Sequence, residues 1–367
     1  LNATADYSEF TTSQFNVGIG SQASASSSMG LSARYELFTG GRKLNNAKVA
    51  EAELDASSAG EVGARYLLAL STERDYYDVL GARELLTVAN ERLDRARQQF
   101  AVARARVQSG ATVQSDSLQT LLEVQRAEAN LVAREAALAV ARLQLGQRIG
   151  DDGPVDAAAI DGMAPDDLPV SLERAVQLAA RQGPAWLQAR ARERAAEASL
   201  RARHGSYLPT VALTCSYTVS DIKFVPEARR RGSVGINLQW SLWDGGQREL
   251  AVSGLKIARD VARTVREDIE RGARRDITEA HMGYDVARRT LALQQSAVVV
   301  AAEVLRVQEA RYQAGASTIL ELLDAQAQLS QVQADLVRAR YDVRLARSAL
   351  EAMLGARLSS DLNRDDP

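Results

Sequence analysis

A long internal repeat restricts the fold of this sequence more than any other feature. Three glycine-containing sequences each occur twice, 205 residues apart: Gly40–Gly41 and Gly245–Gly246 at the ends of FTGG and WDGG, Gly110 and Gly315 in RVQSGAT and RYQAGAS, and Gly150 and Gly355. The two halves align without a gap from Tyr35 to Gly150. Because repeated sequences fold into similar units, the chain is predicted to contain two copies of one structural unit.

Each copy begins with a region in which apolar and polar residues alternate. The second copy alternates from Val211 to Val219 and again from Val234 to Leu242, and the first copy from Met29 to Leu37. This period of two predicts β-hairpins with two different faces. About ten alternating residues also match the length of a tilted membrane strand. The alternative is the edge of a soluble β-sandwich.

Aromatic residues lie where these strands are expected to end, beside the paired glycines. They are Trp240 and Trp243 in the second copy, and Tyr35 and Phe38 at the equivalent places in the first. A membrane barrel carries an interfacial aromatic belt at such positions, whereas in a soluble sandwich these would be core residues. The opposite face of the strands would line a lumen, and it carries Arg34, Glu36, Asn237 and Gln239.

A long helical pattern follows each Gly-Gly pair. It continues for roughly 65 residues, to Gly110 and Gly315, which corresponds to a helix on the order of 100 Å long. A second helix returns from each glycine, and in the second copy it carries a heptad seam from Leu322 to Met353. Ordinary globular helices are about a fifth as long. We therefore expect a tube or coiled coil in which these helices pack along their length.

The segment between the copies differs in kind. DDGPVDAAAIDGMAPDDLP is a proline-rich, acidic connector, and the residues after it predict two shorter helices that are broken at Gly183–Pro184. Ser171 is the expected cap of the first of these helices.

Four strands per chain cannot close a membrane barrel, because the smallest barrels have eight strands and open edges are not tolerated in lipid. Two chains would supply eight strands and three would supply twelve. A wide aqueous lumen requires the larger barrel, so we expect a homotrimer. No run of 18 or more apolar residues occurs, and we expect no transmembrane helix.

Composition argues against an enzyme. The single cysteine, Cys215, rules out an intrachain disulfide. The only histidines are His204 and His281, which argues against a histidine-based metal site or a catalytic triad within one subunit. No phosphate-binding loop or nucleophile elbow is present. A net charge of −2 gives no sign of nucleic-acid binding. We expect no cofactor, no metal and no catalytic residue.

The start of the chain lacks the charged and then apolar pattern of a signal peptide. It opens in a strand-like segment, LNATADYSEF, so we expect a further N-terminal piece before it.

Several of these sequences resemble the outer-membrane efflux protein family, the TolC-like outer-membrane factors. The matching pieces are YELFTGG, LQWSLWDGG, YLPTVAL, QSGAT and RYQAGASTILELLDAQAQL, and the likeness covers nearly the whole chain. The resemblance implies a trimer in the outer membrane of a Gram-negative bacterium. Its twelve-stranded transmembrane β-barrel would continue into a twelve-helix periplasmic α-barrel with an equatorial belt of short helices, so that a large part of the protein is periplasmic.

On this plan the chain has six segments. They are the first β-hairpin of the barrel (1–41), the first long helical hairpin (42–150), the connector and equatorial short helices (151–206), the second β-hairpin (207–245), the second long helical hairpin (246–355) and a C-terminal equatorial tail (356–367).

The resemblance places a periplasmic gate just after Gly315. The residues concerned are Leu320, Glu321 and Asp324, which share a helix face at spacings of three and four. Three subunits would form rings of like charge around a narrow lumen. Asp116, one repeat before Glu321, is expected to hold the inner helix pair through Tyr312 or Arg311. The alternative is that these are solvated charges on a helix surface.

The helical turns carry Gly110, Ala111, Gly315 and Ala316, which we expect to contact a periplasmic adaptor, because small residues let another backbone approach closely. The alternative is that glycine only ends each helix in the left-handed conformation.

These expectations describe a passive duct in a tripartite efflux system. Its partners would be a periplasmic adaptor (membrane fusion protein), through it an inner-membrane transporter, and outer-membrane lipid. A duct for type I protein secretion is the alternative that the sequence does not separate from efflux. A soluble coiled-coil scaffold is a third reading, although it would not require barrel-type strands in two copies.

Overall fold

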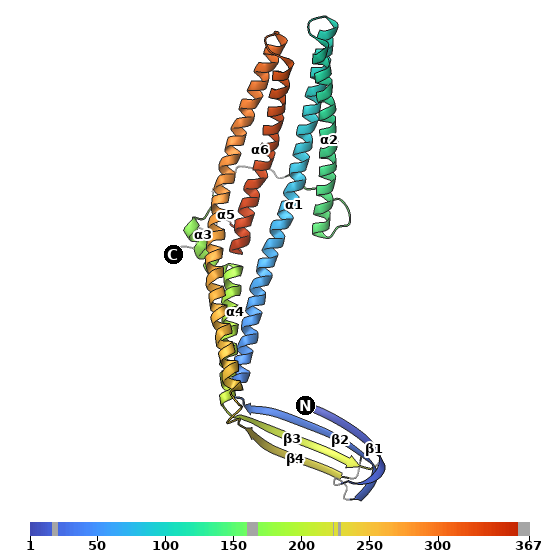
Figure 1. Ribbon diagram of the computed structural model, residues 1–367, viewed down its shortest axis with the longest axis vertical. Coiled ribbons are helices and arrows are strands. Elements are labelled where there is room, and N and C mark those ends of the chain that lie inside the picture. The colour runs from blue at the N-terminus through green and yellow to red at the C-terminus, as the bar shows by residue number, and fades with distance from the viewer. Residues whose placement is uncertain (17–20, 160–167, 223, 227–228, 359–367) are drawn as a thin grey trace. The chain divides into compact units, whose positions relative to one another are not determined.

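The computed structural model describes residues 1–16, 21–159, 168–222, 224–226 and 229–358. Figure 1 shows the helices and strands that these residues form. In chain order they are β1 (Asn2–Asn16), β2 (Ser21–Phe38), α1 (Arg42–Gln108), α2 (Gln114–Ile149), α3 (Leu172–Gln182), α4 (Pro184–His204), the 3-10 turn η1 (Gly205–Tyr207), β3 (Thr210–Asp221), β4 (Arg229–Gln239), α5 (Gln247–Gln313) and α6 (Ile319–Leu354).

The helices confirm the predicted duplication. Helices α1 and α5 each have 67 residues, and α2 and α6 each have 36. Within the described residues, positive φ angles occur only at the repeated glycines: Gly40, Gly41, Gly110, Gly150, Gly245, Gly246, Gly315 and Gly355. The left-handed region suits glycine because it has no Cβ. The repeated glycines are therefore the points where both copies end a strand or a helix.

Contacts divide the chain into two compact units. The first contains Leu1–Ser57 and Ala189–Glu267, and the second contains Ser58–Gln188 and Asp268–Pro367. The first unit holds the sheet and the helical segments that join it, and the second holds the helical turns at Gly110 and Gly315.

The four strands form one antiparallel sheet in the order β1-β2-β3-β4 (Figure 1). Each copy contributes one hairpin, and β2 pairs with β3 to join the two hairpins. The predicted strands of about ten residues are confirmed for β3 and β4, with 12 and 11 residues, whereas β1 and β2 are longer, with 15 and 18. β1 and β4 are paired on one side only, so both edges of the sheet are open.

The register confirms that the sheet has two different faces. Residues paired across antiparallel strands point to the same side, and the pairing aligns Tyr35 with Leu213 and Leu213 with Ile236 on one face. On the other face it aligns Glu36 with Ala212 and Ala212 with Asn237. We call these the apolar face and the polar face. Large side chains of the apolar face are exposed in the single chain: Met29, Leu31, Tyr35, Tyr217, Val234, Ile236 and Leu238.

The prediction that the last strand continues to Leu242 is wrong, because β4 ends at Gln239. Its partner β3 begins at Thr210, which pairs with Gln239, and the preceding residue is Pro209. Proline has no N–H with which to extend a ladder. Trp240 and Leu242 therefore follow the strand and are not part of it.

Two glycine backbones meet where the sheet joins the helices of the first unit. A Cβ at Gly205 would lie 2.6 Å from the carbonyl oxygen of Gly40, and a Cβ at Gly40 would lie even closer to the carbonyl oxygen of Gly205. The end of α4 and the turn after β2 are therefore in direct backbone contact, which requires the absence of a side chain at both positions.

The predicted break at Gly183–Pro184 is confirmed, because α3 ends at Gln182 and α4 begins at Pro184. The hydroxyl of Ser171 caps α3 by accepting a hydrogen bond from the backbone N–H of Arg174 at 3.3 Å. Trp186 is buried in the second unit, in a cluster that contains Ile277 and Leu350.

The heptad seam packs as predicted through most of α6. Leu322, Ala325 and Leu329 are buried in a cluster with Leu305 and Tyr312 of α5. Further along α6, Ala339 and Val343 pack against Tyr284 and Leu291 of α5. Met353, at the end of the predicted seam, is 39% exposed.

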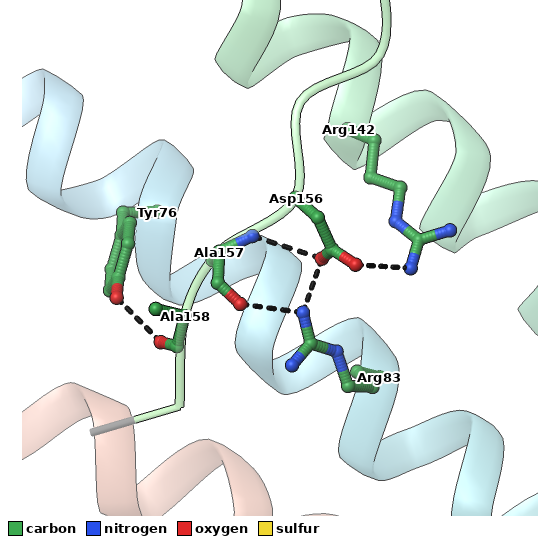
Figure 2. A network of polar contacts seen from close by, with 6 residues as sticks. All are labelled: Tyr76, Arg83, Arg142, Asp156, Ala157 and Ala158. Atoms are coloured by element: carbon green, nitrogen blue, oxygen red, sulfur yellow. Dashed lines mark hydrogen bonds and ion pairs between the residues drawn. The ribbon is translucent and has the colours of Figure 1, made fainter.

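The described part of the connector lies against the first long hairpin (Figure 2). Asp156 forms ion pairs with Arg83 of α1 and with Arg142 of α2, the latter at 2.7 Å. Arg83 also donates to the carbonyl oxygen of Ala157 at 2.6 Å, and the Tyr76 hydroxyl donates to that of Ala158 at 2.5 Å. Residues 160–167 of the predicted connector and residues 359–367 of the predicted tail lie outside the described residues.

The expectation of no transmembrane helix rests on uninterrupted apolar runs, and one described helix meets a broader test of length and composition alone. Helix α5 contains an 18-residue stretch with a mean hydropathy of 1.3 and at most two charged residues, most of it exposed. The expectation counted uninterrupted apolar residues, whereas the mean over a window tolerates isolated polar ones.

Candidate functional site

The two helical turns of the second unit share one backbone geometry. Gly110 and Gly315 have φ angles of 75° and 71°. The N–H of each glycine donates to the carbonyl three residues earlier, and the N–H of the following alanine donates to the carbonyl five residues earlier, at 2.8 Å in both turns. This pattern is a Schellman motif, which ends an α-helix tightly. Both glycines therefore end their helices in the left-handed conformation.

Both turns are also accessible. Gly110, Ala111, Gly315 and Ala316 are all exposed, and a Cβ at either glycine would meet no atom within 4 Å. The predicted contact residues thus lie on the surface of the single chain, and the positive φ alone accounts for glycine at positions 110 and 315.

The helices that return from the turns begin differently. Thr318 caps α6 by accepting from the N–H of Glu321 at 3.3 Å, and its hydroxyl donates to the Glu321 carboxylate at 3.3 Å. At the equivalent place in the first copy, Val113 gives α2 no side-chain cap. Asp116, the counterpart of Glu321, accepts a hydrogen bond from the Thr112 hydroxyl instead.

One arginine joins the two hairpins near these turns. Arg106 of α1 donates to the backbone carbonyl oxygen of Tyr312 of α5 at 2.7 Å, and its guanidinium lies 4.9 Å from the centre of the Tyr312 ring. Tyr312 is only 4% exposed, and its hydroxyl has no hydrogen-bond partner in the described structure. Burial and the nearby charge of Asp116 raise the pKa of Tyr312.

The contacts of the predicted gate residues differ in part from expectation. Asp116 is close enough to Tyr312 to affect its pKa, but within the described residues no hydrogen bond joins Asp116 to Tyr312 or to Arg311. Arg311 donates to the carbonyl oxygen of Ala316 in its own hairpin, at 3.4 Å. Sequence reasoning missed Arg106, although its position four residues before Gly110 matches that of Arg311 before Gly315.

Leu320, Glu321 and Asp324 lie together on the first turns of α6. All three are exposed in the single chain, and Leu320 is 61% exposed. Asp324 accepts a hydrogen bond from the Gln328 side chain at 2.7 Å. The side chains predicted to form a constriction therefore keep much of their surface uncovered in the single chain.

Further from the turns, a second polar contact joins α1 to α6. Glu84 accepts a hydrogen bond from the Tyr341 hydroxyl at 2.6 Å and forms an ion pair with Arg340 at 2.7 Å. The Tyr341 ring stacks on Tyr77 of α1, with ring centres 5.7 Å apart. Burial and the Glu84 carboxylate raise the pKa of Tyr341. The hairpins are thus held together at the turns and, through these contacts and a hydrogen bond of 3.5 Å from Arg95 to Ser330, along α6.

In the first unit, the register places Arg34, Glu36, Asn237 and Gln239 together on the polar face. Tyr35 lies on the apolar face. An irregularity in the pairing after Glu36 leaves Leu37 without a partner and sets Phe38 opposite Val211, so Phe38 joins the apolar face as well. Trp240 donates from its indole N–H to the carbonyl oxygen of Tyr207 at 3.2 Å, and Trp243 is 83% exposed.

The two faces continue into the first turn of α1. Arg42 forms an ion pair at 3.8 Å with Glu36 of the polar face. The neighbouring Lys43 lies 5.7 Å from the ring centre of Tyr35 on the apolar face. Adjacent residues of α1 thus serve opposite sides of the sheet.

Comparisons with known proteins agree with this architecture. The family described as "Outer membrane efflux protein" matches residues 1–151 and 175–356. The outer membrane efflux protein BepC of Brucella suis is 25% identical over 339 residues, which cover 91% of this chain and 73% of BepC. The outer membrane protein TolC of Escherichia coli is 24% identical over 308 residues, which cover 80% of this chain and 62% of TolC, less than two thirds of its length. The outer membrane protein VceC of Vibrio cholerae has the same fold, with a TM-score of 0.83 at 18% identity over 98% of this chain and 87% of that chain.

Proposed function

Because the chain belongs to the outer membrane efflux protein family, we propose that it is one subunit of a homotrimeric outer-membrane channel. The channel is the passive exit duct of a tripartite efflux system for small molecules such as drugs, toxic compounds or metal ions. It docks to a periplasmic adaptor and, through it, to an inner-membrane pump. The bacterium is Gram-negative, and the helical part of the chain lies in the periplasm.

The observation that carries this proposal is the open, two-faced sheet. Both edge strands, β1 and β4, have unpaired backbone groups, which cannot face lipid. Pairing of β4 with β1 of the next subunit removes every edge, and three subunits of four strands give a twelve-stranded barrel. The exposed apolar face then meets lipid, and the polar face lines a lumen wide enough for water.

The proposal also assigns a place to each part of the chain. Residues 1–41 and 207–245 form the barrel, 42–150 and 246–355 form a twelve-helix α-barrel in the trimer, and 151–206 with 356–367 form the equatorial belt. Arg34, Glu36, Asn237 and Gln239 line the lumen. Tyr35, Phe38, Trp240 and Trp243 form the aromatic belt at the membrane interface.

The gate lies at the helical turns. Rings of Leu320, Glu321 and Asp324 narrow the lumen, and their exposure in the single chain agrees with a place inside an oligomer. Asp116, Tyr312 and Arg311 belong to the same gate, and we add Arg106, whose contacts with Tyr312 join the hairpins within one subunit. Hydrogen bonds to charged groups contribute about 1.5–3 kcal/mol. An adaptor that contacts Gly110, Ala111, Gly315 and Ala316 can offset a contact of this size.

Two measurements on the purified protein test the proposal. Light scattering in detergent is expected to give the mass of three chains, and a planar bilayer is expected to show discrete conductance steps after the protein is added. A water-soluble monomer that is stable without detergent would contradict both the trimer and the channel. Trimers that conduct no ions even when Arg106 and Asp324 are replaced would contradict the duct alone.

A further inference from the structure

A small pocket lies in the first unit, near the joint between the sheet and the helices. It has a volume of about 300 Å³ and is lined by the start of α1, the end of α4, η1 and one residue of α5. Pockets that bind small molecules have volumes of about 300–1,000 Å³. This pocket is therefore at the small end of the range.

The polar part of the lining contains two arginines. In the described structure, no hydrogen bond or ion pair engages the guanidinium of Arg203, and its Nε is shielded from solvent without a partner. Arg42 has one ion pair, with Glu36 at 3.8 Å, in which both side chains are about half exposed. A pair of this kind is weak. The pocket thus holds two positive charges and little to neutralise them.

A further donor lies beside the arginines. The side-chain amide of Asn46 lines the pocket and makes no hydrogen bond to the described residues. The hydroxyls of Ser199 and Ser206, also in the lining, already donate to the carbonyl oxygens of Ala195 and Arg203, so they offer only acceptors. The free donors are therefore guanidinium and amide N–H groups, which suit an oxyanion.

The rest of the lining is apolar. Val49, Ala202 and Leu255 come from three different helices and supply hydrocarbon surface next to the charged groups. A bare inorganic anion would leave that surface uncovered. A small organic anion would cover it while placing its charge against the arginines.

One residue of the pocket lining, Arg42, contacts the polar face of the sheet. Arg42 turns toward Glu36 of the polar face, whereas its neighbour Lys43 turns toward Tyr35 of the apolar face. In the barrel of the proposed function, on which this step rests, the polar face is the lumen. The pocket is then open to molecules passing through the channel.

We propose that this pocket binds small amphipathic organic anions in the lumen, with Arg203, Arg42 and Asn46 holding the carboxylate, sulfonate or phosphate group. Val49, Ala202 and Leu255 hold the apolar part. The pocket thereby gives anionic cargo a binding site where the helices join the barrel.

The test uses 1-naphthalenesulfonate, a fluorescent amphipathic anion, in equilibrium dialysis against the full-length protein in detergent, with a detergent-only chamber as blank. Saturable binding is expected. Arg203→Gln is expected to weaken binding about tenfold, and Arg203→Lys, which keeps the charge, is expected to weaken it less. The matched control is Arg201→Gln, because Arg201 lies on the same helix, is exposed and does not line the pocket. Uncharged 1-naphthalenemethanol and sodium sulfate are expected to bind weakly or not at all.

Equal binding by the original protein and Arg203→Gln would overturn the proposal, and so would equal binding of 1-naphthalenemethanol. Conductance in a planar bilayer is measured on the same preparations, with and without the sulfonate. If the protein without sulfonate shows no conductance but its binding of the sulfonate depends on Arg203, the duct is refuted and the pocket is supported. If the protein conducts but its binding of the sulfonate does not depend on Arg203, the pocket is refuted and the duct is supported.

Discussion

Arg106 and Tyr312, 206 positions apart in the chain, make two contacts with each other: the guanidinium donates to the Tyr312 carbonyl oxygen at 2.7 Å and lies over its ring at 4.9 Å. One side chain of the first repeat thus contacts the second repeat through the carbonyl oxygen and the ring of Tyr312, and not through its hydroxyl. The hydroxyl itself is buried without a partner in the described structure.

Replacing Arg106 with glutamine is therefore expected to loosen the gate. The loss of a charged hydrogen bond and a cation–π contact corresponds to about 2 kcal/mol, which shifts an open–closed equilibrium by more than tenfold. Single-channel recordings in a planar bilayer are expected to show a higher mean conductance. Tyr312→Phe keeps the carbonyl and the ring, so its conductance should stay close to that of the original protein. Arg104→Gln, an exposed change on the same helix, is the control, and an equal rise in both arginine variants would remove Arg106 from the gate.

The two faces of β4 provide a matched pair of substitutions. Ile236 is 73% exposed on the apolar face, and Asn237 lies next to it on the polar face. A lysine on the lipid side of a barrel costs about 2–4 kcal/mol near the bilayer midplane. Ile236→Lys is expected to reduce the amount of trimer recovered from outer membranes, as measured by fractionation and unheated gel electrophoresis, whereas Asn237→Lys should leave it unchanged. The opposite result would mean that the faces are assigned the wrong way round.

The exposed turns are best probed at alanine. A side chain at position 315 would be strained by the positive φ of Gly315. If such a variant failed to bind the adaptor, the result could reflect either misfolding or loss of the contact. Ala316→Trp and Ala111→Trp avoid that strain and are expected to abolish co-purification with a co-expressed periplasmic adaptor, while light scattering still gives the trimer. Ala133→Trp, at an exposed position within α2, is the control. If the adaptor still co-purifies in normal amounts with tryptophan at both turns, the turns do not form the contact with the adaptor.

The connector is expected to respond to acid. Desolvation alone would raise the pKa of Asp156, but hydrogen bonds from Arg83 and Arg142 outweigh this and hold the pKa below its usual value. Because the folded-state pKa is lowered, the stabilisation is present at neutral pH and is lost as the pH falls below about 4. Asp156→Asn should lower the free energy of unfolding by about 1 kcal/mol at pH 7, since the pairs are partly exposed.

Chemical denaturation at pH 7 and pH 3 measures this difference. The gap between the original protein and Asp156→Asn should shrink at the lower pH. A constant gap would show that charge does not account for the contact.

The sequence predicts the repeat and the helical seam because both depend on residue types at fixed spacing. Gly110 and Gly315 end their helices through their own positive φ angles. The spacing of Leu322 and Leu329 alone marks the side of α6 that is buried, although the residues that bury it come from α5. Arg106 could not be assigned from the sequence, since its acceptor is a backbone carbonyl, and every residue has one.

The end of β4 escaped prediction for a related reason. The alternation in the sequence runs on to Leu242, but a strand needs a partner, and the partner of Gln239 is the first residue of β3. The extent of a strand thus depends on two segments, whereas the pattern of apolar residues reports on one.

The contact between Gly40 and Gly205 leaves no space in which the end of α4 could slide past the turn after β2. We therefore expect this backbone contact to be rigid, so that the strand and the helix on its two sides move together. Bending that accompanies any opening at the far ends of the helices has to be absorbed along the helices themselves. Substitutions near Gly40 and Gly205 are therefore not expected to change how readily the channel opens.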